Sequence, residues 1–298
     1  MTERPICSYE GSQYSTEFWT SERTYEDSVE RVALQTLLPP QGRRLMEVGA
    51  GFGRLADLYA GYDTVVLLDY ASTQLEQAVE RLGEYGPGGK PHYIFVQADF
   101  YRLPFVEGLF DTVTMIRTLH HAWDAPAVVQ GIARTLGPKG AFVLEFANKQ
   151  NLKALLRYCI GRQTWSPFTP EPVEFVKLNF NFHPRWIWKQ LEAAGLRREA
   201  VRTVSHFRIP LLKQLVPTSL LVQLDALAQR TGALWQWSPS VFVRARAGAG
   251  RADAAEGAFF RCPECKATLG SPPQTEFVCE CGKRWQREGL IYNFRDPR

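Results

Sequence analysis

Residues 47–53 read Glu-Val-Gly-Ala-Gly-Phe-Gly and close a short apolar run that begins at Leu45. Glycines at such a point permit positive φ angles and let a ligand approach the backbone. A helix over Arg54–Tyr59 is expected next, with its unpaired N–H groups and positive dipole end directed at the same ligand. The sequence therefore predicts a strand, a glycine turn and a helix, with a small-molecule site where they meet.

The spacing of these glycines argues against two common nucleotide-binding motifs. The dinucleotide fingerprint G-x-G-x-x-G, counted from Gly49, requires glycine at position 54, where the chain has Arg54. The P-loop pattern is also missing, because Gly89-Lys90 is followed by Pro91. Nicotinamide or flavin binding is disfavoured, and ATP hydrolysis has no support.

Short β-rich runs alternate with amphipathic segments on either side of the glycine turn. An opening helix is expected over Thr24–Leu38, and helical stripes end at Gly83 and at Gly137-Pro138. Because parallel strands need crossover connections, this alternation predicts an α/β fold with an open parallel sheet. The expected strands are Leu45–Val48, Thr64–Asp69, Tyr93–Gln97, Phe110–Ile116 and Ala141–Phe146.

The pattern is less regular after residue 146. Helices are expected over Asn151–Tyr158, Trp186–Ala194 and Leu211–Leu234, and two β-rich pieces, Glu199–Phe207 and Ser240–Arg244, would complete the sheet. Residues 245–257 contain only small and charged residues, which indicates a flexible linker. The predicted units are a domain over 1–244 (opening helix 1–40, core 41–147, helical lid and last strands 148–244), the linker, and a small tail domain over 258–298.

The glycine turn also fits the pattern E/D-x-G-x-G-x-G. From about Thr24 to Ala245 the chain resembles class I S-adenosylmethionine-dependent methyltransferases, near the broad group that includes quinone-ring methylating enzymes. The resemblance implies a Rossmann-like, seven-stranded, mostly parallel sheet. An acidic residue beside backbone amides suits the ammonium and carboxylate of the methionine end, which places Glu47, Gly49, Ala50, Gly51 and Gly53 there.

The remaining cofactor residues are expected at the ends of the next three strands. Asp69 lies 20 residues after Gly49, where a carboxylate can accept both ribose hydroxyl hydrogens, and Tyr70 follows it. The resemblance implies that Asp99 meets the adenine amino group and that Phe100 packs on the ring. Arg117, at the end of the fourth strand, would face the same crevice.

Methyl transfer needs alignment of the acceptor, and a general base only where the acceptor carries a tightly held proton. His120 and His121 follow the fourth strand and are the catalytic candidates, although in the resembled group such a pair also shapes the pocket or caps a helix. The segment from Phe146 to Pro239 is rich in aromatic residues. It would either line a pocket for a flat or lipid-like acceptor or pack a helical lid.

The tail carries Cys262-Pro-Glu-Cys265 and, thirteen residues later, Cys279-Glu-Cys281. Four thiolates from two tight turns suit a structural Zn²⁺, and a short tail needs such a staple to fold. The tail resembles a zinc ribbon, although its second turn is CxC where CxxC is expected, and a redox-active pair is the rival interpretation. Basic residues around Trp285 and Tyr292 would suit RNA, and a partner protein is the other option for this ribbon.

Composition narrows the class further. The 298 residues are 45% hydrophobic and 22% charged, near the average for globular proteins, and the net charge of +4 is too small to argue for nucleic acid. No apolar run is long enough to span a membrane and the N-terminus lacks the layout of a secretory signal, so a cytoplasmic protein is expected. We expect a methyltransferase for a small-molecule or lipid-like acceptor. The alternatives are an rRNA or tRNA methyltransferase that docks its substrate through the ribbon, and a non-catalytic module that binds the cofactor and docks proteins.

Overall fold

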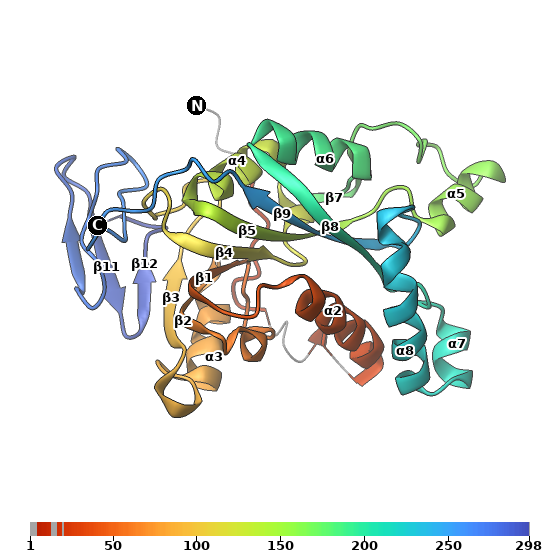
Figure 1. Ribbon diagram of the computed structural model, residues 1–298, viewed down its shortest axis with the longest axis horizontal. Coiled ribbons are helices and arrows are strands. Elements are labelled where there is room, and N and C mark those ends of the chain that lie inside the picture. The colour runs from red at the N-terminus through yellow and green to blue at the C-terminus, as the bar shows by residue number, and fades with distance from the viewer. Residues whose placement is uncertain (1–4, 13–16, 20, 298) are drawn as a thin grey trace.

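A ten-stranded sheet runs through the molecule (Figure 1). The computed structural model describes residues 5–12, 17–19 and 21–297. Neighbouring strands follow the order β10-β11-β12-β3-β2-β1-β4-β5-β9-β8, and a separate hairpin pairs β6 (Val173–Val176) with β7 (Asn179–Asn181). The strands of the large sheet are β1 (Gly42–Val48), β2 (Tyr62–Asp69), β3 (His92–Gln97), β4 (Phe110–Met115), β5 (Leu136–Ala147), β8 (Leu196–Val204), β9 (Ser240–Ala247), β10 (Glu276–Val278), β11 (Arg284–Glu288) and β12 (Ile291–Asn293).

Seven of these strands form the predicted mostly parallel, Rossmann-like sheet. Strands β3, β2, β1, β4 and β5 are parallel, whereas β9 runs antiparallel to both β5 and β8. In the register, Glu47 lies opposite Leu67 and Thr114, and Asp69 lies opposite Gln97. The carboxyl ends of β1 to β4 therefore meet at one edge, where ligands bind in open α/β sheets.

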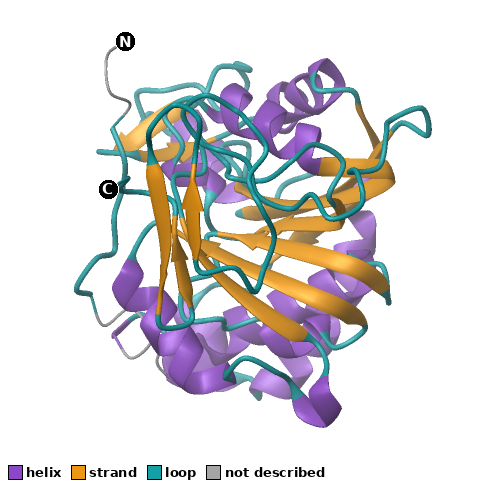
Figure 2. Ribbon diagram, turned by 90° about the vertical axis from the view of Figure 1, so that its left-hand side faces the viewer, coloured by secondary structure: helices purple, strands orange, loops and turns teal. Residues whose placement is uncertain are grey.

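Helices cover both faces of the sheet, as Figures 1 and 2 show. Alternate strand residues enter different cores: Met46 and Val48 belong to one buried cluster and Leu45 to the other. None of the helices in the described ranges is long and apolar enough to cross a bilayer. The helices are α2 (Thr24–Leu37), α3 (Ser72–Leu82), α4 (Ala125–Thr135), α5 (Leu152–Cys159), α6 (Pro184–Ala193), α7 (Pro210–Leu215) and α8 (Thr218–Ala228).

Two of the expected helices differ in the structure. Residues 50–58 close successive i to i+3 turns, such as that from the Gly53 amide to the Ala50 carbonyl at 3.0 Å, so only a short 3₁₀ helix forms at Ala56–Tyr59. The helix expected over Leu211–Leu234 divides at Pro217, because proline lacks the amide needed inside a helix.

The tail is part of the main sheet, in contrast to the tethered domain expected from the sequence. β12 pairs in parallel with β3, with Ile291 opposite Phe95 and Asn293 opposite Gln97. The preceding stretch is also held: β9 extends to Ala247, and the Arg251 guanidinium donates to the carbonyls of Ala133 and Ala194. A flexible linker is therefore not what this part of the structure shows.

A cluster of aromatic side chains joins the tail to the core. Phe260 is fully buried, and its ring centroid lies 5.9 Å from that of Phe105 in the core and 4.7 Å from that of Phe294 in the tail. Trp285 and Tyr292 are also buried. The stacking surface that these two residues would offer to RNA is thus occupied by packing.

Replacing Phe260 tests this continuity. We expect Phe260→Ala to lower the free energy of unfolding of the whole chain by about 3–5 kcal/mol, because it opens a cavity between tail and sheet. The exposed Val278→Ala in the same tail should cost less than about 0.5 kcal/mol. Denaturant unfolding followed by circular dichroism measures both. A tail that melts separately, with the main transition unchanged, would contradict the shared core.

Candidate functional site

A cavity opens at the carboxyl edge of β1, β2 and β4. Its wall combines the glycine turn, the ends of these strands and part of the N-terminal segment. Its lining residues are Cys7, Tyr9, Trp19, Glu47, Gly49, Ala50, Gly51, Phe52, Arg54, Leu55, Leu68, Asp69, Tyr70, Gln74, Phe100, Ile116, Arg117, Thr118 and His121.

Glu47 is the most unusual group in this wall. The residue is 3% exposed, and its Oε2 atom has no hydrogen-bond partner among the described residues. Burial raises the pKa of Glu47 to about 8, although the Arg54 guanidinium and the Tyr59 hydroxyl act in the opposite direction. An unpaired carboxylate oxygen in a buried position is costly, which indicates that a donor group is missing from the cavity.

The glycine turn is tighter than the sequence suggested. The amides of Gly49 and Ala50 donate to the Leu68 carbonyl at 2.8 and 3.0 Å, and the Gly51 amide donates to Asp69 Oδ2 at 2.8 Å. The expectation of bare amides at these three residues is therefore corrected, because the neighbouring strand already satisfies them. Gly51, with φ +53°, still faces open space: a Cβ atom there would meet only the Gln74 side chain, at 3.9 Å.

Glycine is required at position 49 for a different structural reason. A Cβ atom at this residue would lie 2.1 Å from Thr118 Oγ1, so only glycine lets the turn pack against the end of β4. Gly53 packs against Leu82 and does not line the cavity. The three glycines thus shape the turn in three ways, and Gly51 is the one that leaves room for a ligand.

The second and third strands contribute Asp69, Tyr70 and Phe100 to the wall. Burial raises the pKa of Asp69 against the hydrogen bonds from the Gly51 and Ala71 amides, and each of its oxygens keeps capacity for a further donor. Asp99 lies beside Phe100 but outside the lining. Its Oδ1 accepts from the Tyr101 amide at 2.8 Å.

Two arginines lie at the far side of Glu47. Glu30 is buried and accepts from Arg54 Nη2 at 2.9 Å and from Arg117 Nε at 2.7 Å, which fixes both guanidinium groups at the cavity. Arg117 adopts φ +55°, a strained backbone for this residue type, and its amide donates to Glu145 at 2.9 Å. Arg117 lines the cavity as the sequence predicts, whereas the contribution of Arg54 was missed.

The two histidines are placed differently. His121 lines the cavity and is 8% exposed, whereas His120 is not part of the lining. The Leu178 carbonyl accepts from His121 Nδ1 at 3.2 Å, so Nε2 is the unprotonated nitrogen and accepts from the Tyr9 hydroxyl at 3.1 Å. Burial lowers the pKa of His121, which favours the neutral form of its imidazole.

The N-terminal segment supplies cavity residues that could not be predicted from the sequence. Cys7, Tyr9 and Trp19 line the cavity, and the Arg54 guanidinium lies 3.7 Å from the Trp19 ring centroid. Tyr25 is unrelated to the cavity, because its hydroxyl donates to Asp225 at 2.6 Å. When a segment that lines a site contains no motif, a single sequence offers no pattern that would identify its residues.

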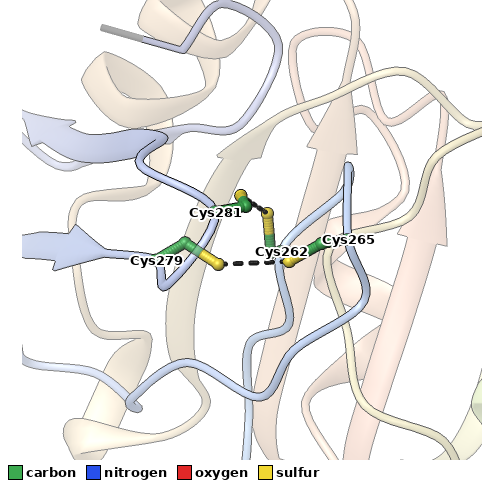
Figure 3. A group of neighbouring side chains, drawn as sticks. All are labelled: Cys262, Cys265, Cys279 and Cys281. Atoms are coloured by element: carbon green, nitrogen blue, oxygen red, sulfur yellow. Dashed lines mark hydrogen bonds between the residues drawn. The ribbon is translucent and has the colours of Figure 1, made fainter.

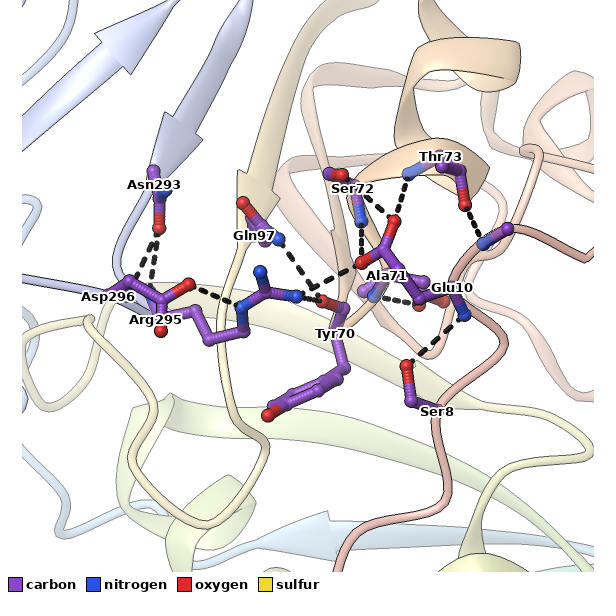
Figure 4. A network of polar contacts seen from close by, with 12 residues as sticks. Ser8, Glu10, Tyr70, Ala71, Ser72, Thr73, Gln97, Asn293, Arg295 and Asp296 are labelled. Atoms are coloured by element: carbon purple, nitrogen blue, oxygen red, sulfur yellow. Dashed lines mark hydrogen bonds and ion pairs between the residues drawn. The ribbon is translucent and has the colours of Figure 1, made fainter.

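Glu10 and Arg295 connect both ends of the chain to the second strand (Figure 4). Arg295 Nη1 donates to the Tyr70 carbonyl at 3.0 Å and to Glu10 at 3.1 Å, and its guanidinium lies 5.1 Å from the Tyr70 ring centroid. Burial acts to raise the pKa of Glu10, but hydrogen bonds from Thr73, Arg295 and Ser72 lower it to about 2. The tail therefore fixes Tyr70, a residue of the cavity wall.

The four cysteines of the tail come together (Figure 3). All their Sγ atoms lie within 4.8 Å of one another, with 3.8 Å between those of Cys262 and Cys281 and 3.3 Å between those of Cys265 and Cys279. Zinc bonded tetrahedrally to sulfur at about 2.3 Å requires sulfur atoms about 3.8 Å apart. The CxC turn therefore brings both of its thiols to the cluster.

The comparisons with known proteins agree with this fold. Residues 46–144 match the family model described as "Methyltransferase domain". A crystal structure of an S-adenosylmethionine-dependent methyltransferase from Mesorhizobium loti superposes with a TM-score of 0.52 at 20% identity, covering 74% of this chain and 99% of that one. Residues 46–144 are therefore similar to a methyltransferase domain, and the chain shares the fold of that methyltransferase structure.

Two curated methyltransferases are similar to part of this chain. A ubiquinone biosynthesis O-methyltransferase from Paracidovorax citrulli is 36% identical over 129 residues, which are 43% of this chain and 52% of that protein. The protein of the same name from Thiobacillus denitrificans is 29% identical over 178 residues, which are 58% of this chain and 72% of that protein. The chain thus spans about half the length of the first of these relatives.

The raised pKa of Glu47 leads to a prediction about how the free energy of unfolding depends on pH. Its folded pKa of about 8 exceeds the ordinary value of 4.5, so between these pH values the folded state retains a proton that the unfolded state releases. Stability from this group is therefore lost as the pH rises toward 8. We expect Glu47→Gln to raise the free energy of unfolding at pH 8 by on the order of 1–4 kcal/mol, and by little near pH 4.5.

Denaturant unfolding across this pH range measures the effect, and the exposed Glu76→Gln is the matched control, which should shift stability little at any pH. An unchanged or lower stability of Glu47→Gln at pH 8 would show that the carboxylate already has a partner in the folded chain.

Proposed function

We propose that this chain is an S-adenosylmethionine-dependent methyltransferase that acts on a small or lipid-like acceptor. The observation that carries the proposal is the unpaired, buried Oε2 atom of Glu47 in a cavity that Asp69 and Phe100 also line. In such a cavity Glu47 would bind an ammonium group, Asp69 would bind ribose hydroxyls, and Phe100 would pack against an aromatic base. The methyl donor has all three groups and supplies an electrophilic methyl on a sulfonium.

Each part of the wall has a distinct task in this proposal. Glu47 would bind the ammonium, and Arg54 and Arg117 would balance the cofactor carboxylate, because the amides of the turn are already satisfied. Gly51 leaves the backbone open to the ligand, and Tyr70 and Phe100 enclose the nucleoside. Glu30 would keep both arginines in place through the hydrogen bonds that it accepts from them.

His121 is the better of the two catalytic candidates. Its Nε2 atom presents a lone pair toward the cavity, where the Tyr9 hydroxyl now donates to it. An acceptor hydroxyl in the same place would give its proton to Nε2 as it becomes nucleophilic. The names of the curated relatives, which include ubiquinone biosynthesis O-methyltransferases, favour a hydroxyl acceptor of this kind.

Zinc is the second part of the proposal. The tetrad of Cys262, Cys265, Cys279 and Cys281 would hold one structural Zn²⁺, which fixes the two turns of the tail. Through β12 and Arg295 the tail would then keep the edge of β3 covered and Tyr70 in place. This assigns the metal a structural task remote from the chemistry.

The reaction is tested with a radiolabelled methyl donor and fractionated cell extract. We expect label in small molecules or lipids and none in RNA. If label entered only RNA, the acceptor would be RNA and not a small molecule or lipid. If no label were transferred and calorimetry showed no binding of the methyl donor, the proposal that the chain is a methyltransferase would be refuted.

With a labelled acceptor fraction in hand, His121→Gln should lower the turnover by about 10²–10⁴-fold, because the proton acceptor is lost. His120→Gln is the matched control and should keep most of the activity. Initial rates at saturating donor measure both. Equal losses in the two variants would show that the pair acts through packing rather than through proton transfer.

Metal content tests the tetrad. Inductively coupled plasma mass spectrometry should find one zinc per chain, and Cys262→Ser should lose it and lower the melting temperature by at least about 4 °C. The exposed Cys159→Ser should change neither quantity. A disulfide within the tetrad and no bound metal would favour the redox interpretation.

A further inference from the structure

Helix α5 turns its apolar side toward solvent. Leu152, Leu156 and Ile160 follow at intervals of four residues, so they lie on one face, and they are 53%, 58% and 62% exposed. Within the helix only Ala154 is buried. Surface helices of globular proteins normally direct such a stripe into the core. In Figure 1, α5 stands at the outer end of the molecule, away from the sheet.

Positive charge follows the same helix. Lys153 and Arg157 are exposed, are four residues apart and lie along one side of the apolar stripe, and Arg162 is exposed just beyond it. No ion pair of these three side chains is found within the described ranges. Residues 148–170 contain four basic residues and no acidic one. The charge of +4 in this segment equals the net charge of the whole chain, although Lys149 is buried and the β6–β7 hairpin adds one acidic residue, Glu174, and one basic residue, Lys177.

The exposed apolar surface continues beyond the helix. Phe168 is 56% exposed and packs its ring edge against Tyr158, with 6.0 Å between the centroids. Phe175 and Val176, on the β6–β7 hairpin, are 51% and 59% exposed. The intervening loop is anchored, because the buried Lys149 donates to Thr169 Oγ1 at 2.9 Å and to the Glu171 carbonyl at 2.5 Å.

The same segment borders the cavity. The turn of the β6–β7 hairpin supplies the Leu178 carbonyl that holds His121, and Phe180 contacts Trp123 next to that histidine, at 5.9 Å between ring centroids. A surface that binds the outer side of this hairpin would therefore lie close to the catalytic side of the cavity.

We propose that α5 and the β6–β7 hairpin dock on a bilayer surface that contains anionic lipids, and that the acceptor reaches the cavity from that bilayer. The proposal rests on the proposed function, of which it specifies the acceptor as a membrane-dissolved molecule. An apolar stripe with lysine and arginine along its side is the pattern of a helix that lies in a membrane interface. A second copy of the chain fits less well, because face-to-face docking would bring the same cations together.

Vesicle co-sedimentation of the full chain tests the proposal. The wild type should sediment with vesicles of phosphatidylcholine and phosphatidylglycerol, stay in solution with phosphatidylcholine alone, and be released by salt. Lys153→Ala/Arg157→Ala should weaken vesicle binding by about 30-fold, at about fivefold per charge. Leu156→Ser/Ile160→Ser should abolish it at the same salt concentration.

A matched control lies on α6, where Arg185 and Lys189 are also exposed and four residues apart. Arg185→Ala/Lys189→Ala should sediment as the wild type does. A wild type that stays in solution with both vesicle types, or a control pair that loses binding equally, would overturn the proposal. A dimer in light scattering that Leu156→Ser/Ile160→Ser dissociates would assign the face to a second copy instead.

Calorimetry with S-adenosylhomocysteine separates this proposal from the proposed function. Both α5 variants should bind this compound as the wild type does, since they lie outside the cavity. Vesicle binding without any binding of S-adenosylhomocysteine would leave the docking surface standing and refute the enzyme. The converse result would refute the docking surface alone.

Discussion

The buried carboxylate of Glu47 is the constraint on which the site depends. The chain has an acidic group at the end of β1, burial raises the pKa of this group, and one of its oxygens has no hydrogen-bond partner in the described part of the chain. Such a group lowers the stability of the folded chain, because its desolvation is not fully compensated. Two neighbouring elements shape the site: the glycine turn leaves open space at Gly51, and Glu30 accepts hydrogen bonds from Arg54 and Arg117.

The tail contacts that site, although the two are far apart in the sequence. An unpaired β3 would be an edge strand, and such edges invite pairing with other chains. β12 covers it, and the same strand leads directly to Arg295, which holds the Tyr70 carbonyl. The cysteine tetrad lies at the base of this arrangement. The tail, the covered sheet edge and Tyr70 in the cavity wall are thus connected through a few short elements.

Much of this architecture could be predicted from the sequence, because the signals are local. The strand ends at Val48, Asp69 and Gln97 follow from β-rich runs that stop at polar or glycine residues. The alternation of these runs with helices predicts the open parallel sheet, and the family resemblance implies its seven strands. The pairing of Ile291 with Phe95 could not be predicted. It joins a three-residue strand to a partner almost two hundred positions away, and no periodicity marks such a contact.

The site shows the same division. Glu47, Asp69, Tyr70, Phe100, Arg117 and His121 all line the cavity, because each lies at or within a few residues of the carboxyl end of a parallel strand. Gly53 and Asp99 occupy the right loops but turn their groups to Leu82 and Tyr101. Tyr9 and Trp19 were not foreseen, because a segment without secondary structure carries no pattern. Whether an amide is free depends on the register of the neighbouring strand, as Gly49 and Ala50 illustrate.

The most direct test of this account is a calorimetric cycle with S-adenosylhomocysteine and its deaminated analogue, on the wild type and Glu47→Gln. If Glu47 is reserved for an ammonium group, the wild type should prefer the amino compound strongly and the variant should lose most of that preference. An equal preference in the two proteins would contradict the central claim, because the amino group would then be recognised elsewhere in the cavity.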